Sequence, residues 1–253
     1  MMKVSIITIT YNSEATLKET IESVMNQTYP NIEYIIIDGL SQDNTLSIVN
    51  NYKDKISKVV SEKDNGLYDA LNKGINLATG DVIGILHSDD FYTHPQVIEH
   101  VVKTIQEKEA DALYADLYYV DRSDTTKVFR KWKSGHYKHG MFYKGWMPPH
   151  PTFFAMKFCY EKYGVFNLNF KSAADYELLL RFIHKHQVKL AYLPEFIIKM
   201  RVGGKSNQSF SNRLRANQED RKAWKINGLK PKVYTLYAKP LRKLMQFFFN
   251  QEI

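Results

Sequence analysis

The first ninety residues alternate between short runs rich in Val and Ile and amphipathic segments with helical periodicity. An apolar run, a helix and a second apolar run pack most readily as two parallel strands joined by a crossover helix. The alternation therefore predicts an α/β fold with a mostly parallel central sheet and helices on both faces. Ligands are then expected in the loops at the carboxyl ends of the strands. The four expected strands span residues 3–9, 32–37, 57–61 and 82–86.

The pattern changes after residue 92. Two extended segments rich in tyrosine follow, at residues 111–120 and 126–133, and we expect them to pair as antiparallel strands. A helix is expected over residues 173–184 and a short strand over residues 189–193. We accordingly expect one domain at residues 1–205 and a basic helical tail at residues 206–253. The domain has two halves, residues 1–92 and residues 93–205.

Local signals also suggest where some helices begin. Ser13 precedes apolar residues at helical spacing, and a serine at that point can cap the first backbone N–H groups of a helix. We therefore expect Ser13 to cap the helix that follows the first strand.

The cysteine count, the apolar runs and the charge distribution indicate in which compartment the protein works. Cys159 is the only cysteine among 253 residues, so an intrachain disulfide is excluded and a reducing compartment, the cytoplasm, is favoured. No run of about 18 apolar residues occurs, so no transmembrane helix is expected. The net charge of +8 is concentrated near the C-terminus, where eight basic and no acidic residues lie between Arg221 and Gln251.

The basic tail also carries apolar residues at helical spacing. Such a stretch can lie on anionic lipid, so we expect peripheral contact with the inner face of a membrane. The alternative is that the same face packs on the protein's own core. The tail carries no recognised RNA- or DNA-binding motif, so we expect no nucleic-acid partner. The apolar residues are Tyr237, Leu241, Leu244, Met245 and Phe248.

Carboxylates follow two of the expected strands. Asp38 ends the second apolar run, and Asp89 with Asp90 follows the fourth. Adjacent carboxylates repel each other unless a cation or hydrogen bonds hold them, and oxygen ligands suit a hard divalent cation. The pair therefore predicts a metal site. The alternative is a solvated loop that leads into a helix near Pro95.

Four short motifs occur in order at the ends of expected elements, and together they resemble the family 2 glycosyltransferases. They are residues 4–12 (VSIITITYN), 36–39 (IIDG), 64–66 with 72–74 (DNG and NKG) and 86–90 (LHSDD). The resemblance covers roughly residues 3–205. It implies the GT-A fold, a nucleotide-diphosphate sugar donor, Mn²⁺ or Mg²⁺ as cofactor, and inversion at the anomeric carbon.

The resemblance also implies roles for individual residues on the donor side. Tyr11 matches the position that lies against the nucleobase, with core packing as the alternative, and Asp38 matches the one that hydrogen-bonds the base. Asp89 is expected to face the ribose or sugar, while Asp90 reaches the metal ion. The further donor-binding residues that the resemblance implies are Thr8, Asn72 and Lys205. Lys205 lies in the segment 201–207 (RVGGKSN), which resembles a loop that closes over the diphosphate.

The second half supplies the acceptor side. Residues 170–181 (FKSAADYELLLR) resemble the family segment in which an acidic residue at a helix start acts as general base. Asp175 fits that role because the small Ala173 and Ala174 leave room for a substrate. Glu177 ranks second, and the alternative for Asp175 is a first-turn charge that stabilises the helix dipole. His150, between two prolines, is expected to contact the acceptor.

These expectations combine into an inverting glycosyltransferase that adds one sugar in cell-surface polysaccharide or lipopolysaccharide assembly. The donor nucleotide is expected to be UDP, because Asp38 could accept the imide proton of uracil, with thymine and guanine as alternative bases for the same carboxylate. The acceptor is expected to be a saccharide or a lipid-linked sugar. A non-catalytic relic that binds nucleotide-sugars remains the main alternative. A nucleotidyltransferase is disfavoured because no glycine-rich loop follows the first strand.

Overall fold

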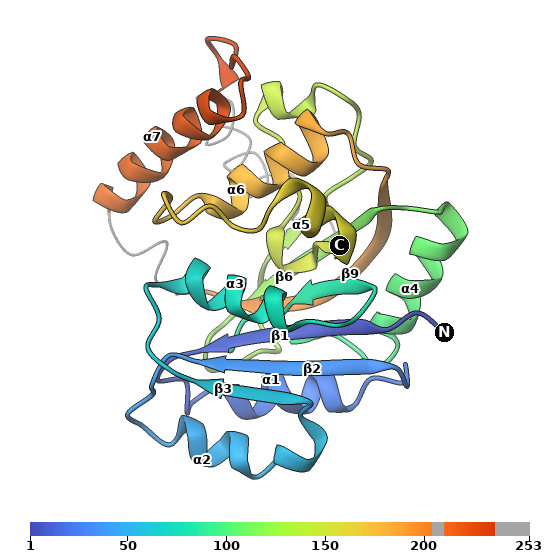
Figure 1. The fold of residues 1–253 in the computed structure, drawn as a ribbon, viewed down its shortest axis with the longest axis vertical. Helices are drawn as coiled ribbons and strands as arrows, with labels where there is room; N and C mark the ends of the chain where they lie inside the picture. The colour runs from blue at the N-terminus through green and yellow to red at the C-terminus, as the bar shows by residue number, and fades with distance from the viewer. Residues whose placement is uncertain (204–209, 236–253) are drawn as a thin grey trace.

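One mixed sheet organises the molecule. The computed structural model describes residues 1–203 and 210–235, and within them nine strands share a sheet (Figure 1). Four parallel strands form one half, in the order β3-β2-β1-β4. Their bounds are β1 Val4–Thr10, β2 Ile32–Asp38, β3 Lys58–Ser61 and β4 Val82–Ile85. All four were expected from the sequence, and the observed ends differ by one residue at most.

The other half of the sheet mixes directions. Beyond β4 the order is β8-β6-β9-β5, with β7 paired to β6. β6 and β7 form the expected antiparallel pair, and β6 runs parallel to β9. β9 is much longer than the short strand predicted, because it pairs with both β6 and β5. The bounds are β5 Asp90–Tyr92, β6 Ala112–Val120, β7 Val128–Trp132, β8 Phe154–Met156 and β9 Leu190–Arg201.

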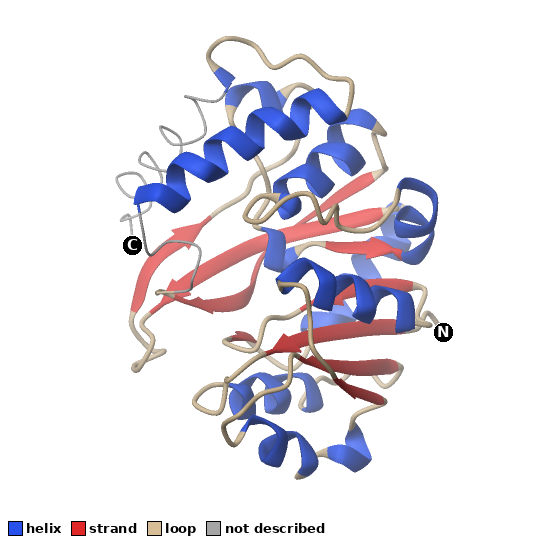
Figure 2. Cartoon of the chain, turned by 60° about the vertical axis from the view of Figure 1, so that its left-hand side comes forward, coloured by secondary structure: helices blue, strands red, loops and turns tan. Residues whose placement is uncertain are grey.

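Helices cover both faces of the sheet, as the alternation predicted (Figure 2). Alternate residues of β1 belong to two cores: Ile6 packs with α1 and α4, whereas Ile7 packs with α3 and α6. The helices are α1 Leu17–Met25, α2 Thr45–Asn50, α3 Leu67–Leu77, α4 Val97–Lys108, α5 Lys157–Tyr163, α6 Ala174–Leu179 and α7 Phe210–Ile226. A π-helix, η4 (Leu180–Lys185), continues α6, and three single turns are η1 Lys53–Lys55, η2 Met141–Lys144 and η3 His150–Thr152.

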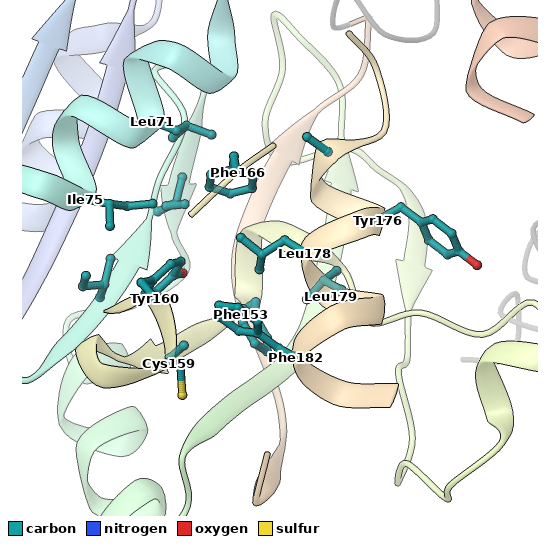
Figure 3. Packing of buried hydrophobic residues seen from close by; sticks show 14 of the residues in the cluster. Leu71, Ile75, Phe153, Cys159, Tyr160, Phe166, Tyr176, Leu178, Leu179 and Phe182 are labelled. Atoms are coloured by element: carbon teal, nitrogen blue, oxygen red, sulfur yellow. The ribbon is translucent and has the colours of Figure 1, made fainter. Parts of the chain in front are cut away.

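Aromatic packing joins the two halves of the chain. Leu71 of α3 and Leu178 of α6 meet around Phe153 and Phe166 in one buried cluster (Figure 3). A close approach elsewhere needs glycine: a Cβ on Gly84 of β4 would lie 2.3 Å from the Phe154 ring of β8. Residues 1–92 and 93–205 therefore share a continuous core.

The prediction for the start of α1 was wrong. The helix begins at Leu17, and Ser13 does not cap it. The Ser13 hydroxyl instead lies 2.9 Å from that of Ser88, because the loop after β1 folds against the loop after β4.

Part of the expected tail packs on the domain. Trp224 of α7 is fully buried, and its Nε1–H donates to the hydroxyl of Tyr176 at 2.8 Å. Asn227 donates to the carboxylate of Glu177 at 3.0 Å. The tail residues with helical spacing, from Tyr237 to Phe248, lie outside the described residues. Among the described residues, no helix combines the length and apolar character needed to cross a bilayer.

Candidate functional site

A cavity of about 940 Å³ opens at the carboxyl ends of β1 and β4. Both halves of the chain line it, as expected for an α/β sheet whose loops converge at one edge. The structure brings five of the predicted site residues together there: Tyr11, Asp89, Asp90, His150 and Asp175. Its apolar wall includes Leu71, Phe153 and Phe166, which belong to the cluster in Figure 3.

Tyr11, Gly39 and Asp64 line the β1 and β3 side of the cavity. The Tyr11 side chain is 51% exposed, so it does not pack in the core. A Cβ on Gly39 would lie 3.4 Å from the Tyr11 ring and 3.0 Å from Oδ2 of Asp64. Gly39 therefore lies against both the Tyr11 ring and the Asp64 carboxylate, and a larger side chain at position 39 would crowd them. Oδ1 of Asp64 accepts a hydrogen bond from Lys73 at 2.7 Å.

Asp38 is placed differently from the prediction. It is fully buried, and it is not among the residues that line the cavity. Its carboxylate accepts hydrogen bonds from the Ser41 amide at 3.1 Å, from the Ser41 hydroxyl, and from the Ser61 hydroxyl at 2.6 Å. The carboxylate thus ties the loop after β2 to β3, and its contact with a nucleobase stays a prediction.

Two more of the predicted donor contacts face away from the cavity. Thr8 is fully buried in β1 and accepts a hydrogen bond from the Tyr34 hydroxyl at 3.0 Å, because its place in the strand points it into the core. The Asn72 amide clamps the backbone of Phe166 through two hydrogen bonds of 2.8 and 2.9 Å. Lys205 lies outside the described residues.

Asp90 is the most unusual carboxylate in the cavity. It is 1% exposed at the start of β5, and neither carboxylate oxygen has a hydrogen-bond partner within the described residues. Burial raises the pKa of Asp90 well above its usual range, and the neighbouring Asp89 adds to the rise. Arg201 opposes that rise, and its guanidinium donates to the Asp89 carbonyl at 2.6 Å. A buried carboxylate in this state is a good position for a cation.

The acceptor side centres on Asp175, in the first turn of α6. One carboxylate oxygen lies 3.3 Å from Nδ1 of His150, and the other accepts a hydrogen bond from the Tyr68 hydroxyl at 3.4 Å. Glu177 is 2% exposed and forms a bidentate ion pair with Arg181. The second-ranked candidate is therefore committed to the core, and Asp175 is the one that lines the cavity.

Two histidine rings meet beside this carboxylate. The rings of His87 and His150 lie 5.7 Å apart, edge to face. Burial, together with the neighbouring His150, lowers the pKa of His87 to about 4. Burial also lowers the pKa of His150, while Asp175 opposes that change. Both imidazoles are therefore neutral at pH 7, and His150 can donate one hydrogen bond and accept another.

Three of the cavity residues to which the sequence analysis gave no role are Asp64, Tyr68 and Arg122. Asp64 stands in one of the four motifs and follows β3, so the rule that selected the other strand-end carboxylates could have found its role. Tyr68 and Arg122 gave no such signal. Tyr68 is brought to Asp175 only by the packing of α3 beside α6, and Arg122 reaches the cavity from the turn between β6 and β7.

Comparisons with known proteins agree with this geometry. Residues 5–164 match the profile of the family described as glycosyl transferase family 2. A Mycobacterium tuberculosis protein named as an uncharacterized glycosyltransferase is 34% identical over 186 residues, which cover 70% of this chain and 68% of that protein.

Solved structures of the same fold are more distant in sequence. Staphylococcus aureus TarS (residues 1–349, in complex with UDP-GlcNAc) superimposes with a TM-score of 0.70 at 18% identity, covering 99% of this chain and 74% of TarS. The mannosyltransferase PcManGT from Pyrobaculum calidifontis, in complex with GDP-Man and Mn²⁺, gives a TM-score of 0.68 at 20% identity, covering 94% and 69%.

Proposed function

Since this chain belongs to glycosyl transferase family 2, we propose that it transfers one sugar, with inversion, from a UDP-sugar to an acceptor hydroxyl. It is a glycosyltransferase with a nucleotide-sugar donor; the nucleotide, the stereochemistry and the acceptor are the proposed parts. One observation carries the proposal: a single cavity holds an exposed aromatic ring, a buried carboxylate with no hydrogen-bond partner among the described residues, and a separate carboxylate beside a neutral histidine. Polysaccharide or lipopolysaccharide assembly is the process that we propose for it.

The nucleobase would lie between the Tyr11 ring and the Asp64 carboxylate. An aromatic ring offers stacking to any base, and a carboxylate can accept the imide N–H of uracil. We assign this contact to Asp64 rather than to Asp38, because Asp64 lines the cavity, whereas Asp38 does not and already accepts three hydrogen bonds from Ser41 and Ser61. The two solved relatives carry UDP and GDP donors respectively, so this fold accommodates both bases.

The carboxylate oxygens of Asp89 and Asp90 are ligands of the kind that a divalent cation prefers. Asp90, with Asp89 beside it, would hold Mn²⁺ or Mg²⁺, because its buried oxygens lack partners within the described residues. When bound, such an ion neutralises a diphosphate and stabilises it as a leaving group. The burial of Asp90 also excludes water from the side of the carboxylate that faces the core.

Asp175 would act as the general base. The acceptor oxygen attacks the anomeric carbon from the side opposite the diphosphate, and its proton passes to the Asp175 carboxylate. The Tyr68 hydroxyl and the His150 ring each hold one oxygen of that carboxylate, so its orientation is set before the acceptor binds. With Nδ1–H directed at Asp175, Nε2 of His150 is left to accept a hydrogen bond from the acceptor.

A donor-hydrolysis panel tests the enzyme against the non-catalytic relic. Purified protein is incubated with UDP-, GDP- and dTDP-sugars in Mn²⁺, and free nucleotide is measured. We expect release from UDP-sugars above the other two, and loss of release in Asp175→Asn. Binding of UDP-sugar by calorimetry without any hydrolysis or transfer to saccharide or lipid-linked acceptors would instead support the relic.

We further propose that the C-terminal segment brings the enzyme to a lipid-linked acceptor at a membrane. Four basic side chains line a groove at the C-terminal end of α7, together with Val233, which is 92% exposed. Basic side chains near an anionic surface contribute about 1 kcal/mol each. The cations are Arg221, Lys225, Lys230 and Lys232.

Co-sedimentation with phosphatidylglycerol vesicles at low salt tests this contact. Neutralising Lys225, Lys230 and Lys232 to Gln should release the protein from the vesicles. Equal sedimentation of the variant and the wild type would overturn the membrane proposal and leave the cavity chemistry unaffected.

A further inference from the structure

A second group of metal-binding side chains lies outside the cavity. His94 follows β5, His100 lies in α4 and Glu195 lies in β9. One ligand atom from each of the three lies within 4.8 Å of the others. None of the three is among the residues that line the cavity, so the proposed glycosyl transfer makes no use of them.

The three side chains converge on one carboxylate. Nδ1 of His100 lies 2.9 Å from Oε2 of Glu195, and Nε2 of His94 contacts Oε1. The two imidazole rings are 5.5 Å apart and tilted by 52°. Their side chains are 28 to 42% exposed, so an ion from solvent can reach them.

Hydrogen bonds around the cluster fix its backbone. Thr93 donates from its amide to the Ile197 carbonyl at 3.1 Å and from its hydroxyl to the Phe196 carbonyl at 2.7 Å, which joins the loop after β5 to β9. The Gln27 amide donates to the His94 carbonyl at 3.0 Å and accepts from the Ile98 amide at 3.0 Å. The ligand-bearing segments are thus held in place independently of any ion.

We propose that His94, His100 and Glu195 form a binding site for a zinc-class transition-metal ion. Two imidazoles and one carboxylate are a donor set that Zn²⁺ accepts readily, with a fourth position left for water. With neutral imidazoles the trio carries one negative charge, which complements a dication. Mg²⁺ prefers carboxylates and water, so it should not occupy this site.

The position of the site suggests what the ion does. It would crosslink β9, α4 and the loop after β5, and β5 begins with Asp90. The pairing of Asp90 with Met200 on β9 places the buried carboxylate and the neighbouring Arg201 together. A bound ion would therefore stabilise the strand pair that supports the cavity, and its role is structural.

Zinc titration in an Asp90→Asn background tests the proposal, because that background removes the cation proposed for the cavity. Calorimetry should show one Zn²⁺ per chain, and Zn²⁺ should raise the Tm. Adding His100→Gln or Glu195→Gln should weaken zinc binding by at least about tenfold. The matched control is His136→Gln, at an exposed histidine outside the cluster, and it should bind zinc as the background does.

A second measurement keeps the result independent of folding. Co²⁺ bound by the nitrogen and oxygen ligands should give visible absorption that is lost on adding Zn²⁺. Absence of both zinc binding and the Co²⁺ spectrum in the folded background protein would overturn the proposal. Zinc binding that is unchanged in both ligand variants would overturn it as well, and would leave the trio as a hydrogen-bonded network.

Discussion

Two buried aspartates follow strands of the same sheet, yet their surroundings are opposite. Asp38, at the end of β2, is fully buried and accepts three hydrogen bonds from two serines. Asp90, at the start of β5, is equally buried and has no partner for either carboxylate oxygen within the described residues. A satisfied buried carboxylate stabilises the fold, whereas an unsatisfied one costs stability and persists where function requires it. From this contrast we propose a structural role for Asp38 and a cation-binding role for Asp90.

Of the substitutions at the two aspartates and at Asp175, Asp90→Asn should have the largest effect on activity. Asp90→Asn removes a charged ligand of the proposed ion, whose Lewis-acid contribution of several kcal/mol corresponds to about a 10³-fold loss in kcat. Steady-state assays with saturating Mn²⁺ measure it. The pKa of Asp90 is raised in the folded protein, so ionising this carboxyl as pH rises lowers the free energy of unfolding. The Tm of Asp90→Asn in EDTA at pH 7 should therefore not fall below the wild-type value. If Asp90→Asn kept the full wild-type kcat in EDTA, Asp90 would not be a ligand of a catalytic cation.

Asp175 should come next, since it separates acceptor chemistry from metal binding. Asp175→Asn removes the proposed general base, so kcat should fall by about 10²-fold while donor affinity stays within a few-fold. Calorimetric titration with UDP-sugar provides the control. If donor binding fails instead, Asp175 belongs to the donor site and the separation of the two carboxylates collapses.

The pH dependence of metal affinity sharpens the contrast further. Because the pKa of Asp90 is raised in the metal-free protein, a proton must leave before the ion binds. The Kd for Mn²⁺ should therefore fall with rising pH, by up to about tenfold per unit below the pKa of Asp90, and then level off. Calorimetry across pH measures the slope. Asp38→Asn should show the same slope, and a flat profile in the wild type would contradict the raised pKa.

Asp38→Asn should change activity least and stability most. The amide presents an N–H₂ group to donors that the carboxylate accepted, at a cost of about 3 kcal/mol. The Tm should fall by roughly 6–12 °C, while kcat should change by less than about threefold. Thermal unfolding with a parallel assay measures both. A large loss of donor affinity without a change in Tm would return Asp38 to the nucleobase.

The parallel strands, and the meeting of Tyr11, Asp90 and Asp175 at one cavity, could be predicted because they depend on local patterns. Apolar runs mark the strands, motifs after them mark Tyr11 and Asp90, and a motif at a helix start marks Asp175. What could not be predicted depends on residues that are distant in the chain. Asn72 is clamped to Phe166, 94 residues away, and Tyr68 meets Asp175, 107 residues away.

Asp38 illustrates the limit most clearly. Its position at a strand end is the same signal that selected Asp90, and only the serines brought to it by the turn and by β3 distinguish the two. Strand-end position predicts that a carboxylate is near the site. Its hydrogen-bond partners in the folded chain decide whether it is available to a ligand.

Direct measurement of Mn²⁺ binding to the matched pair tests the central claim. Calorimetry in the presence of UDP compares the wild type with Asp90→Asn and Asp38→Asn, using temperatures at which all three are folded. The account predicts that Mn²⁺ binding is lost in Asp90→Asn and kept in Asp38→Asn. Equal Mn²⁺ affinity in the wild type and Asp90→Asn, or loss of binding in folded Asp38→Asn alone, would contradict it.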